Sequence, residues 1–247
     1  MSAPVFLIDP DRARSARVGD VIELDGAEGR HASSVRRLRT GEAIELVDGR
    51  GRRLIGSVSE SAAGSCSVAI ETIDDEPEPQ PRITAIQAIA KGDRGELAVQ
   101  MLTEAGVDVI IPWQAEHSIA KWEGDKAHRN HAKWQTTARE SGKQARRARL
   151  PIVDSPITTA AVADLIGNAG VTLILDEEST TPLTSIDFAT AHDVLLVIGP
   201  EGGLSANERE LFADAGGDLV KLGDTVLRTS TAGVAALGVV MSRVGRW

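Results

Sequence analysis

Three glycines, a proline and a glutamate stand close together in the stretch "LLVIGPEGGLSANERE", residues 195–210. Gly199, Gly202 and Gly203 allow the backbone to turn sharply and to approach a ligand closely, and Pro200 stiffens the entry to the turn. The stretch matches neither the phosphate-loop pattern nor the dinucleotide-binding glycine pattern. Because Glu201 is acidic, the turn suits a ligand with positive charge or hydrogen-bond donors better than a phosphate. A tight strand-to-helix connection without a ligand explains it equally well.

A second candidate is the arginine in "LGDTVLRTSTAG", residues 222–233. Arg228 stands where a strand-end turn could hold it against an anionic or carbonyl oxygen, although a surface ion pair is the plainer interpretation. The hydroxyl residues Thr229, Ser230 and Thr231 follow it directly. Hydroxyls at the start of a helix commonly cap its free N–H groups, so capping accounts for them without any chemistry.

Other common catalytic centres have no support in the sequence. The five histidines are scattered, no H-E-x-x-H occurs, and no carboxylate lies at metal-ligand spacing, so we expect no metal site. A G-x-S-x-G nucleophile elbow is also absent. Cys66 is the only cysteine, which excludes an internal disulfide and a cysteine-clustered zinc site, and we expect it to be a small core residue.

Strands and helices alternate through residues 82–247. The apolar runs "ITAIQAIA", "DVIIP", "VTLILDE", "DVLLVIG" and "DLVKLG" read as buried strands, and "RGELAVQMLTEAG", "KWQTTARESGKQARR", "TTAAVADLIGNAG", "SANERELFADAG" and "STAGVAALGVVMSRV" as helices. Ser205 and Glu208 form a capping box that starts one helix near Ala206. The alternation predicts a parallel α/β sheet with helices on both faces. Ligands bind beyond the carboxyl ends of such strands, which selects "LILDEEST", "VIGPEGGLSANE" and "VKLGDTVLRTSTAG".

Residues 1–73 have a different pattern. Short runs rich in Val, Ile and Leu are separated by turn residues, and Asp48-Gly49 between two such runs indicates a hairpin. A small, mostly β barrel is the natural interpretation. Residues 74–81, "DDEPEPQP", alternate acids with prolines, which favours a stiff extended linker between two domains.

Composition indicates an ordinary folded protein of 247 residues, with 42% hydrophobic and 26% charged residues. No apolar run approaches the length of about 20 residues that crosses a bilayer, and the N-terminus lacks the build of a signal peptide, so we expect a cytoplasmic protein without a membrane span. The formal net charge is −9. Basic residues nevertheless cluster, with eight Lys or Arg and one acid in residues 126–149 and an early arginine-rich group. These clusters favour a phosphate-bearing partner.

Together the motifs resemble a known family. "VIGPEGGLSANE" followed by "VKLGDTVLRTSTA" is similar to the C-terminal signature of the ribosomal RNA small subunit methyltransferase E family, within the SPOUT class. "HASSVRRLRTGEAIELVDGRG" resembles its N-terminal segment, "KGDRGELAVQMLTEAGVDVIIPWQAEHS" its first βα unit, and "ESGKQARRARLP" its glutamine, arginine and proline motif. The sequence departs from the family pattern at Leu204, where an aromatic is common, at Ser230, often an acid, and at Gly95, frequently a methionine.

The resemblance implies a fold, a cofactor and a reaction. The fold would be α/β, with a C-terminal SPOUT domain containing a trefoil knot after an N-terminal PUA-like β-barrel that binds RNA. S-adenosylmethionine would donate a methyl group to N3 of a uridine in the decoding region of 16S ribosomal RNA of the small subunit. The enzyme would be a homodimer with its active site near the subunit interface.

The resemblance also implies the site residues. Glycine-turn main-chain groups would hold adenine and ribose, and apolar side chains would line the pocket. We further hypothesise that Arg228 stabilises charge on a uracil oxygen and that Glu201 orients a ligand or accepts the N3 proton; a purely structural Glu201 is the alternative. The expected cofactor site consists of Leu175, Ile198, Gly199, Pro200, Glu201, Gly202, Gly203, Leu222, Gly223, Leu227, Thr231 and Ala232. The expected RNA contacts are Arg36, Arg37, Arg39, Lys91, Arg94, Arg139, Lys143, Arg146 and Arg147.

Two other interpretations stay open on the sequence alone. The chain could be a ribosome-binding or assembly factor that keeps the fold without catalysis. It could also be a methyltransferase of the same class that acts on another RNA or on a ribose oxygen.

Overall fold

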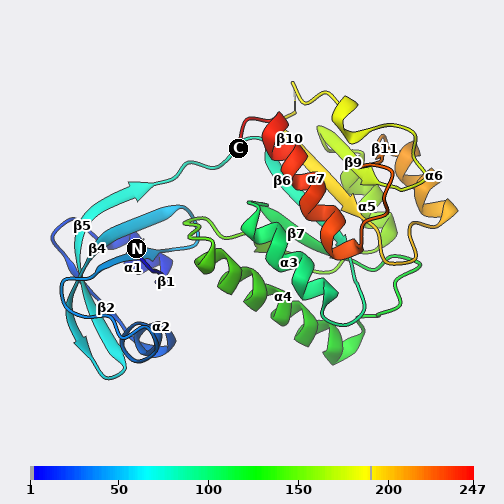
Figure 1. Cartoon of the computed structure of the whole chain (residues 1–247). Helices are drawn as coiled ribbons and strands as arrows, with labels where there is room; N and C mark the ends of the chain where they lie inside the picture. Colours follow the sequence, from blue (N-terminus) through cyan, green and yellow to red (C-terminus); the bar gives the residue numbers. More distant parts are fainter. Residues whose placement is uncertain (1–2, 190) are drawn as a thin grey trace. The chain divides into compact units, whose positions relative to one another are not determined.

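The computed structural model describes residues 3–189 and 191–247. The chain divides into two compact units. The first unit consists of the residues up to Glu78 together with the later segment Gly142–Leu150, and the second consists of Pro79–Ser141 and Pro151–Trp247. Each unit is built on its own β-sheet (Figure 1).

The first unit contains a five-stranded sheet in the order β1-β3-β4-β5-β2. β1 runs parallel to β3 and the other pairs are antiparallel. The expected hairpin is confirmed, since β3 and β4 pair across a turn in which Gly49 has φ 74°. The elements are β1 (Val5–Leu7), α1 (Pro10–Ser15), β2 (Val21–Leu24), α2 (Gly26–Arg30), the π-helical turn η1 (His31–Val35), β3 (Ala43–Val47), β4 (Arg52–Ala62) and β5 (Ser65–Asp75).

Residues from much later in the chain complete this first unit. The N–H of Gly51 donates to the carbonyl of Ala148 (3.1 Å), and the N–H of Leu150 donates to the carbonyl of Gly49 (2.9 Å). The core of the unit includes Cys66, which is 1% exposed. This burial confirms the expectation of a core cysteine, and it raises the pKa of the Cys66 thiol.

The second unit contains a six-stranded, all-parallel sheet in the order β11-β9-β10-β6-β7-β8. The prediction of a parallel α/β sheet is therefore confirmed. Its strands are β6 (Arg82–Ala88), β7 (Val109–Trp113), β8 (Ile152–Val153), β9 (Val171–Leu175), β10 (Asp193–Ile198) and β11 (Asp218–Val220). Its helices are α3 (Arg94–Glu104), α4 (Gly124–Gln144), α5 (Thr159–Ile166), the short 3-10 helix η2 (Leu183–Ser185), α6 (Ala206–Asp214) and α7 (Thr229–Arg243).

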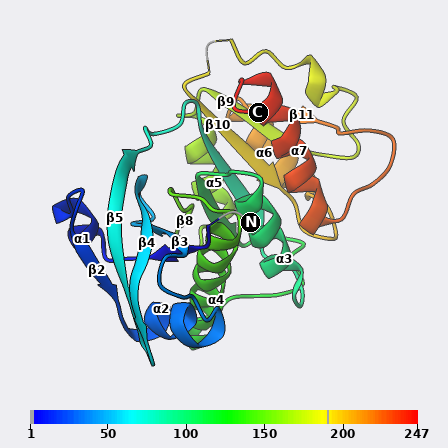
Figure 2. The same cartoon turned by 60° about the vertical axis from the view of Figure 1, so that its left-hand side comes forward.

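Helices cover both faces of this sheet because successive strand residues point to opposite sides. In β10, Leu196 packs into the core shared with α3, α4 and α7, whereas Leu195 packs into the core shared with α5 and α6. Figures 1 and 2 both show α3 and α7 side by side on one face. Because β6, β9 and β10 are parallel, their carboxyl ends lie at the same edge of the sheet, and a loop follows each of them.

The helix expected over residues 133–147 begins earlier than predicted, because α4 starts at Gly124. Its first turns carry polar residues on all sides, so the sequence shows no apolar stripe there. Farther along, Trp134 is buried and would lie 2.9 Å from a Cβ added at Gly95. The departure from the family pattern at Gly95 therefore has a packing reason: the indole occupies the space that a side chain would need.

Candidate functional site

A pocket lies at the carboxyl ends of β9, β10 and β11 in the second unit, and it encloses about 580 Å³ of space that includes open solvent. Three segments form its walls: the end of β9, the glycine turn after β10, and the loop between β11 and α7. These are the three strand ends that the sequence selected. The lining residues are Leu175, Asp176, Glu177, Ile198, Gly199, Pro200, Gly203, Val220, Lys221, Leu222, Gly223, Thr225, Val226, Leu227, Thr229 and Ala232.

Most of the residues expected to hold a cofactor line this pocket, and three do not. Glu201, Gly202 and Thr231 stand next to lining residues without lining it themselves. Conversely, Asp176 and Glu177 line the pocket, although neither was among the expected cofactor contacts. The sequence could have indicated both acids as pocket residues, because they directly follow the buried run "LIL" and therefore stand at a strand end.

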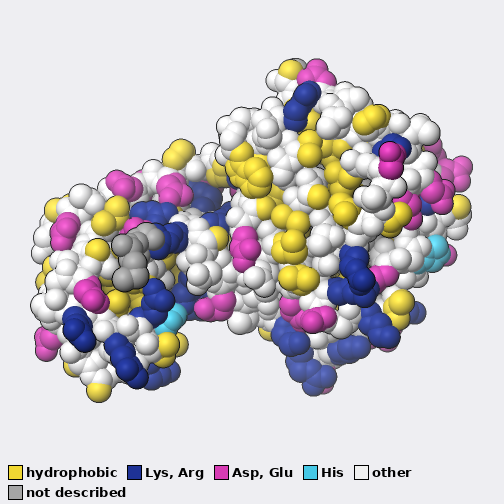
Figure 3. Space-filling view, viewed as in Figure 1, with side chains coloured by type: hydrophobic (Ala, Val, Ile, Leu, Met, Phe, Trp, Pro, Cys, Tyr) yellow, Lys and Arg dark blue, Asp and Glu magenta, His cyan; other side chains and the backbone are white. Residues whose placement is uncertain are grey.

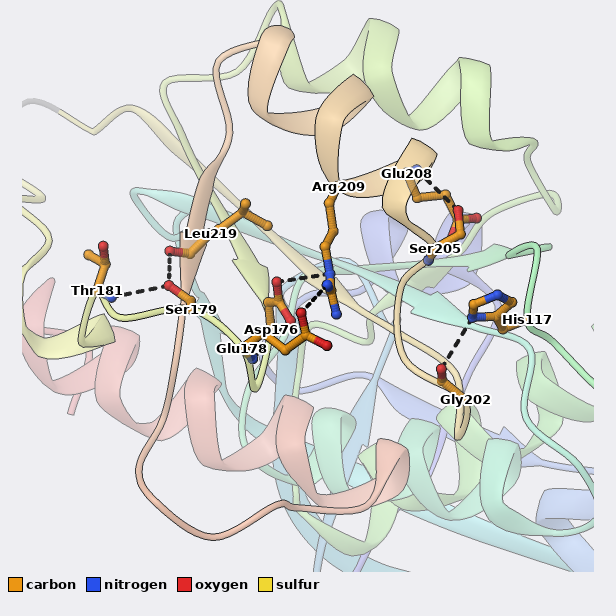
Figure 4. A network of polar contacts seen from close by, with 10 residues as sticks. All are labelled: His117, Asp176, Glu178, Ser179, Thr181, Gly202, Ser205, Glu208, Arg209 and Leu219. Atoms are coloured by element: carbon orange, nitrogen blue, oxygen red, sulfur yellow. Dashed lines mark hydrogen bonds and ion pairs between the residues drawn. The ribbon is translucent and has the colours of Figure 1, made fainter.

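The glycine turn has specific steric requirements. Gly203 has φ 69°, a backbone conformation that residues other than glycine rarely adopt. Its N–H donates to the carbonyl of Pro200 (3.1 Å). A Cβ at Gly202 would lie 3.2 Å from the Cβ of His117, whose Nδ1 lies 3.2 Å from the Gly202 carbonyl (Figure 4). Leu204 is 5% exposed and packs against Gly199. An aliphatic side chain thus fills the position where the family often has an aromatic.

The predicted capping box at the start of α6 is confirmed. Ser205 Oγ accepts from the N–H of Glu208 (3.1 Å), and Glu208 Oε2 accepts from the N–H of Ser205 (3.0 Å), as Figure 4 shows. The other oxygen of Glu208 accepts from the N–H of Glu116 (2.8 Å) and from Thr159 Oγ1 (3.2 Å). Glu208 is 2% exposed, so this buried carboxylate joins the glycine turn to the loop after β7 and to α5.

The acidic wall of the pocket is held by an arginine from α6. Arg209 Nε lies 3.1 Å from Asp176 Oδ2, and a second nitrogen pairs with Glu178 (Figure 4). This hydrogen bond to Arg209 holds the pKa of the Glu178 carboxyl below its ordinary value. Because Asp176 is 5% exposed, the guanidinium keeps its charge balanced at the pocket wall.

Glu201 points to the loop between β6 and α3. Its Oε1 accepts from the N–H of Lys91 (3.1 Å) and lies 3.5 Å from Arg94 Nη1. Its Oε2 is buried and has no hydrogen-bond partner among the residues that the structure describes. The structure therefore brings a predicted catalytic residue together with two predicted RNA contacts that lie more than a hundred residues away in sequence.

Arg228 is the N-cap residue of α7, and its side chain is exposed. It stands between Leu227 and Thr229, which both line the pocket. The expectation that the neighbouring hydroxyls cap the helix is wrong, because α7 has no side-chain cap. Instead, Thr229 Oγ1 donates to the carbonyl of Gly199 (2.7 Å), and Thr231 Oγ1 donates to the carbonyl of Arg228 (3.1 Å).

The expected RNA contacts differ in exposure. Arg36, Arg37 and Arg39 are exposed and follow η1 closely, and Arg139 is exposed on α4. Lys143 is 8% exposed, and its Nζ donates to Glu28 Oε1 (2.8 Å). The Lys143 ammonium is thus paired with a partly buried carboxylate of the same unit. We therefore leave Lys143 out of the proposed RNA contacts.

In the described ranges, 3–189 and 191–247, no group of His, Cys, Asp and Glu side chains is arranged to hold a metal ion. None of the helices described there is both long enough and apolar enough to cross a membrane.

Two family matches define the class of protein. The family described as RNA methyltransferase domain matches residues 76–241, and the family described as RNA methyltransferase PUA domain matches residues 24–71. Together with the parallel sheet and its strand-end pocket, these matches define an RNA methyltransferase with an N-terminal PUA domain.

Individual relatives narrow this class. The chain is 38% identical to ribosomal RNA small subunit methyltransferase E of Mycobacterium bovis, over 100% of this chain and 94% of the relative. The Bacillus subtilis protein of the same name is 28% identical over 88% of each chain. The solved structure of that methyltransferase from Neisseria gonorrhoeae, bound to S-adenosyl methionine, is 27% identical, with a TM-score of 0.85 over 98% of each chain. This chain belongs to the ribosomal RNA small subunit methyltransferase E family, which confirms the resemblance seen in its motifs.

Proposed function

We propose that this protein transfers a methyl group from S-adenosylmethionine to N3 of a uridine in the decoding region of 16S ribosomal RNA. The observation that carries the proposal is the pocket at three strand ends, in a chain whose family is named for methylation of small-subunit ribosomal RNA. A relative in that family has been solved with S-adenosyl methionine bound, which supports the choice of cofactor.

The residues of the pocket fit this cofactor. Its adenine ring needs an apolar wall, and Leu222, Val226 and Leu227 offer one. Its sulfonium and ammonium groups are positively charged, and Asp176 and Glu177 place acidic side chains on the pocket wall at the carboxyl end of β9. The glycine turn lets main-chain groups approach closely at Gly199 and Gly203. When bound there, the sulfonium supplies an already activated methyl group.

The protein's own task is to prepare the uridine. N3 carries a proton at neutral pH, so a group must accept that proton and another must stabilise the resulting charge. We assign charge stabilisation to Arg228, whose exposed guanidinium follows the pocket-lining Leu227. Glu201 orients the base or accepts the proton, and Oε2 is the oxygen left for this because Lys91 and Arg94 occupy Oε1.

RNA binding rests on local positive charge in a protein of net charge −9. In the first unit the proposed contacts are the exposed arginines after η1. In the second unit, Figure 3 shows Lys and Arg side chains gathered over α4, where residues 126–139 carry four of the eight basic residues of the cluster. The proposed phosphate contacts are Arg36, Arg37, Arg39, Lys91, Arg94, Arg139, Arg146 and Arg147.

We also propose a homodimer formed through α7. Hydrophobic side chains gather over α7 and the segment before it (Figure 3). Val226 is 77% exposed and Leu97, on the adjacent α3, is 43% exposed. An apolar surface of this kind is typical of a protein interface.

Further parts of the proposal concern the fold and its setting. We propose a trefoil knot in which the chain passes from the edge strand β11 back to α7, which packs against β10 and β6. The first sheet would close as a PUA-like barrel. The proposed domains are residues 1–73 and 82–247 with a linker at 74–81, and the proposed location is the cytoplasm, where ribosomal RNA is methylated.

Single-turnover methylation of 16S ribosomal RNA by Arg228→Ala and Glu201→Gln tests the catalytic assignment. We expect each variant to lower the rate of methyl transfer at least about a hundredfold while binding S-adenosylmethionine normally in calorimetry. Arg243→Ala, at the far end of the same helix, is the matched control and should keep the wild-type rate. Wild-type rates in both site variants with cofactor affinity intact would show the assignment to be wrong.

Two measurements separate the alternative functions. Calorimetric titration of the wild-type chain with S-adenosylmethionine distinguishes an enzyme from an assembly factor, which has no need of the cofactor. Mass mapping of modified nucleotides in RNA from a deletion strain identifies the target. Loss of a methylated uridine in 16S ribosomal RNA is the expected result, and loss from a transfer RNA or a ribose oxygen would favour the other RNA targets.

A further inference from the structure

A buried bridge of two side chains connects three elements beside the pocket. Gln87, next to the end of β6, donates from Nε2 to Thr229 Oγ1 (2.9 Å) and to the carbonyl of Ala88 (3.2 Å). Thr229, the first residue of α7, donates in turn to the carbonyl of Gly199 (2.7 Å). Gln87 is fully buried and Thr229 is 5% exposed. The bridge thus ties the central strand, the start of α7 and the first residue of the glycine turn together.

The glutamine is an unfavourable residue at this position if packing is its only role. Its Oε1 is buried and has no hydrogen-bond partner among the described residues. A buried carbonyl oxygen without a donor is destabilising, and a leucine of similar size would avoid that penalty. What glutamine adds over leucine is the pair of hydrogen bonds from Nε2, and one of these orients the Thr229 hydroxyl toward Gly199.

The bridge acts on groups that form the pocket. Gly199 and Thr229 both line it, and Ile198 pairs in register with Gln87 between β10 and β6. Arg228 immediately precedes Thr229, and its carbonyl accepts from the N–H of Ala232 (2.9 Å) in the first turn of α7. Holding Thr229 therefore also determines where the Arg228 side chain leaves the helix.

We propose that Gln87 and Thr229 are positioning residues that hold Gly199 and Arg228 in the arrangement required for cofactor binding and methyl transfer. This inference rests on the proposed function, because it assigns that function's ligand to the pocket. Gln87 acts only through Thr229, and Thr229 acts through the Gly199 carbonyl and the Arg228 backbone.

The test compares variants that change one hydroxyl or one carboxamide. Thr229→Val removes the bridge with little change in shape, Thr229→Ser keeps the hydroxyl, and Gln87→Leu removes the carboxamide. Thr172→Val is the matched control, because Thr172 is a threonine of the same sheet that is 4% exposed and whose hydroxyl has no partner in the described chain. S-adenosylmethionine affinity is measured by calorimetry, methyl transfer by single turnover, and stability by tryptophan fluorescence during unfolding.

We expect Thr229→Val to raise the Kd for S-adenosylmethionine about tenfold, the effect of leaving a buried carbonyl without its donor. The same variant should slow methyl transfer at saturating cofactor. Thr229→Ser should restore affinity to within about twofold of wild type. Gln87→Leu should weaken binding about threefold while leaving the unfolding midpoint unchanged or higher, because the unpaired oxygen is gone. Loss of affinity without loss of stability identifies positioning rather than support of the fold.

Three outcomes would overturn the inference while leaving the proposed function intact. The first is that Thr229→Val and Gln87→Leu both keep the wild-type cofactor affinity and the wild-type rate of methyl transfer. The second is that the control Thr172→Val loses as much cofactor affinity as Thr229→Val. The third is that cofactor affinity and protein stability fall together in Gln87→Leu. Failure of the wild-type chain to bind S-adenosylmethionine is a separate result and would refute the proposed function itself.

Discussion

Replacing Glu208 by alanine is expected to destabilise the second unit much more than the loss of a helix cap. The carboxylate accepts from the N–H of Ser205, from the N–H of Glu116 and from the hydroxyl of Thr159, and it is 2% exposed. Only the first of these bonds belongs to the capping box. The other two hold α6 and the glycine turn against the loop after β7 and against α5.

The expected magnitude follows from these contacts. Ser205→Ala removes the cap and should cost about 1 kcal/mol. A hydrogen bond to a charged group contributes about 1.5–3 kcal/mol, but the bonds in Glu208 share one carboxylate and their contributions do not add fully. We therefore expect Glu208→Ala to lower the free energy of unfolding by about 3–4 kcal/mol. For a protein of this size, the midpoint of thermal unfolding would fall by about 10 °C.

Tryptophan fluorescence is the appropriate assay because all four tryptophans belong to the second unit. One of them, Trp113, donates from Nε1 to the same Thr159 hydroxyl that Glu208 accepts (3.2 Å). Unfolding of the second unit is therefore followed without a signal from the first. Denaturant titration at fixed temperature gives the free-energy difference between the variants.

Equal stability of Glu208→Ala and Ser205→Ala would refute this reasoning. It would mean that the bonds to Glu116 and Thr159 contribute nothing beyond the cap. A cost of about 1 kcal/mol for Ser205→Ala, with a larger cost for Glu208→Ala, is the result that supports it.

Three further predictions concern other parts of the chain. Replacing Arg36, Arg37 and Arg39 together by alanine should weaken RNA binding and reduce the slope of log affinity against log salt by about 2, measured by filter binding; an unchanged slope would remove these residues from the RNA contacts. Arg246→Met should destabilise the second unit by about 2–3 kcal/mol in denaturant titration, because it leaves the Asp108 carboxylate, whose side chain is 9% exposed, without its charged partner; a cost near zero would contradict this. Cys66 should react with a thiol reagent near neutral pH only after unfolding, because burial raises its pKa; rapid labelling of the native protein would disprove that.

Much of the second unit could be predicted from the sequence. Short buried runs separated by helical spacing identified its longer strands and its major helices, because burial on both faces leaves a plain apolar signal. Elements with a weaker signal were missed. β1 and β8 contain three and two residues, too few to show a period, and the first turns of α4 lack an apolar stripe.

The candidate site was predictable where it depends on local pattern. The pattern "GPEGG" predicted a tight turn whose backbone could approach a ligand closely. The strand ends predicted the edge of the sheet at which a pocket would form. The partners of each residue were not predictable, because they come from distant parts of the chain. Glu201 contacts the loop at Lys91, and Lys143 is buried against Glu28, although nothing near either residue in sequence indicates it.

By itself, the sequence determined the class of fold, the family and the three segments that surround the pocket, because each depends on residue types within a short stretch. Only the tertiary structure decided the strand order, the interior partner of Lys143 and the bridge from Gln87 through Thr229 to Gly199. Hydrogen bonds form over about 3 Å between groups that the fold brings together, and sequence separation carries no information about that distance. The hydroxyl of Thr229 shows this directly: local pattern predicts a helix cap, and the folded chain directs it to Gly199 instead.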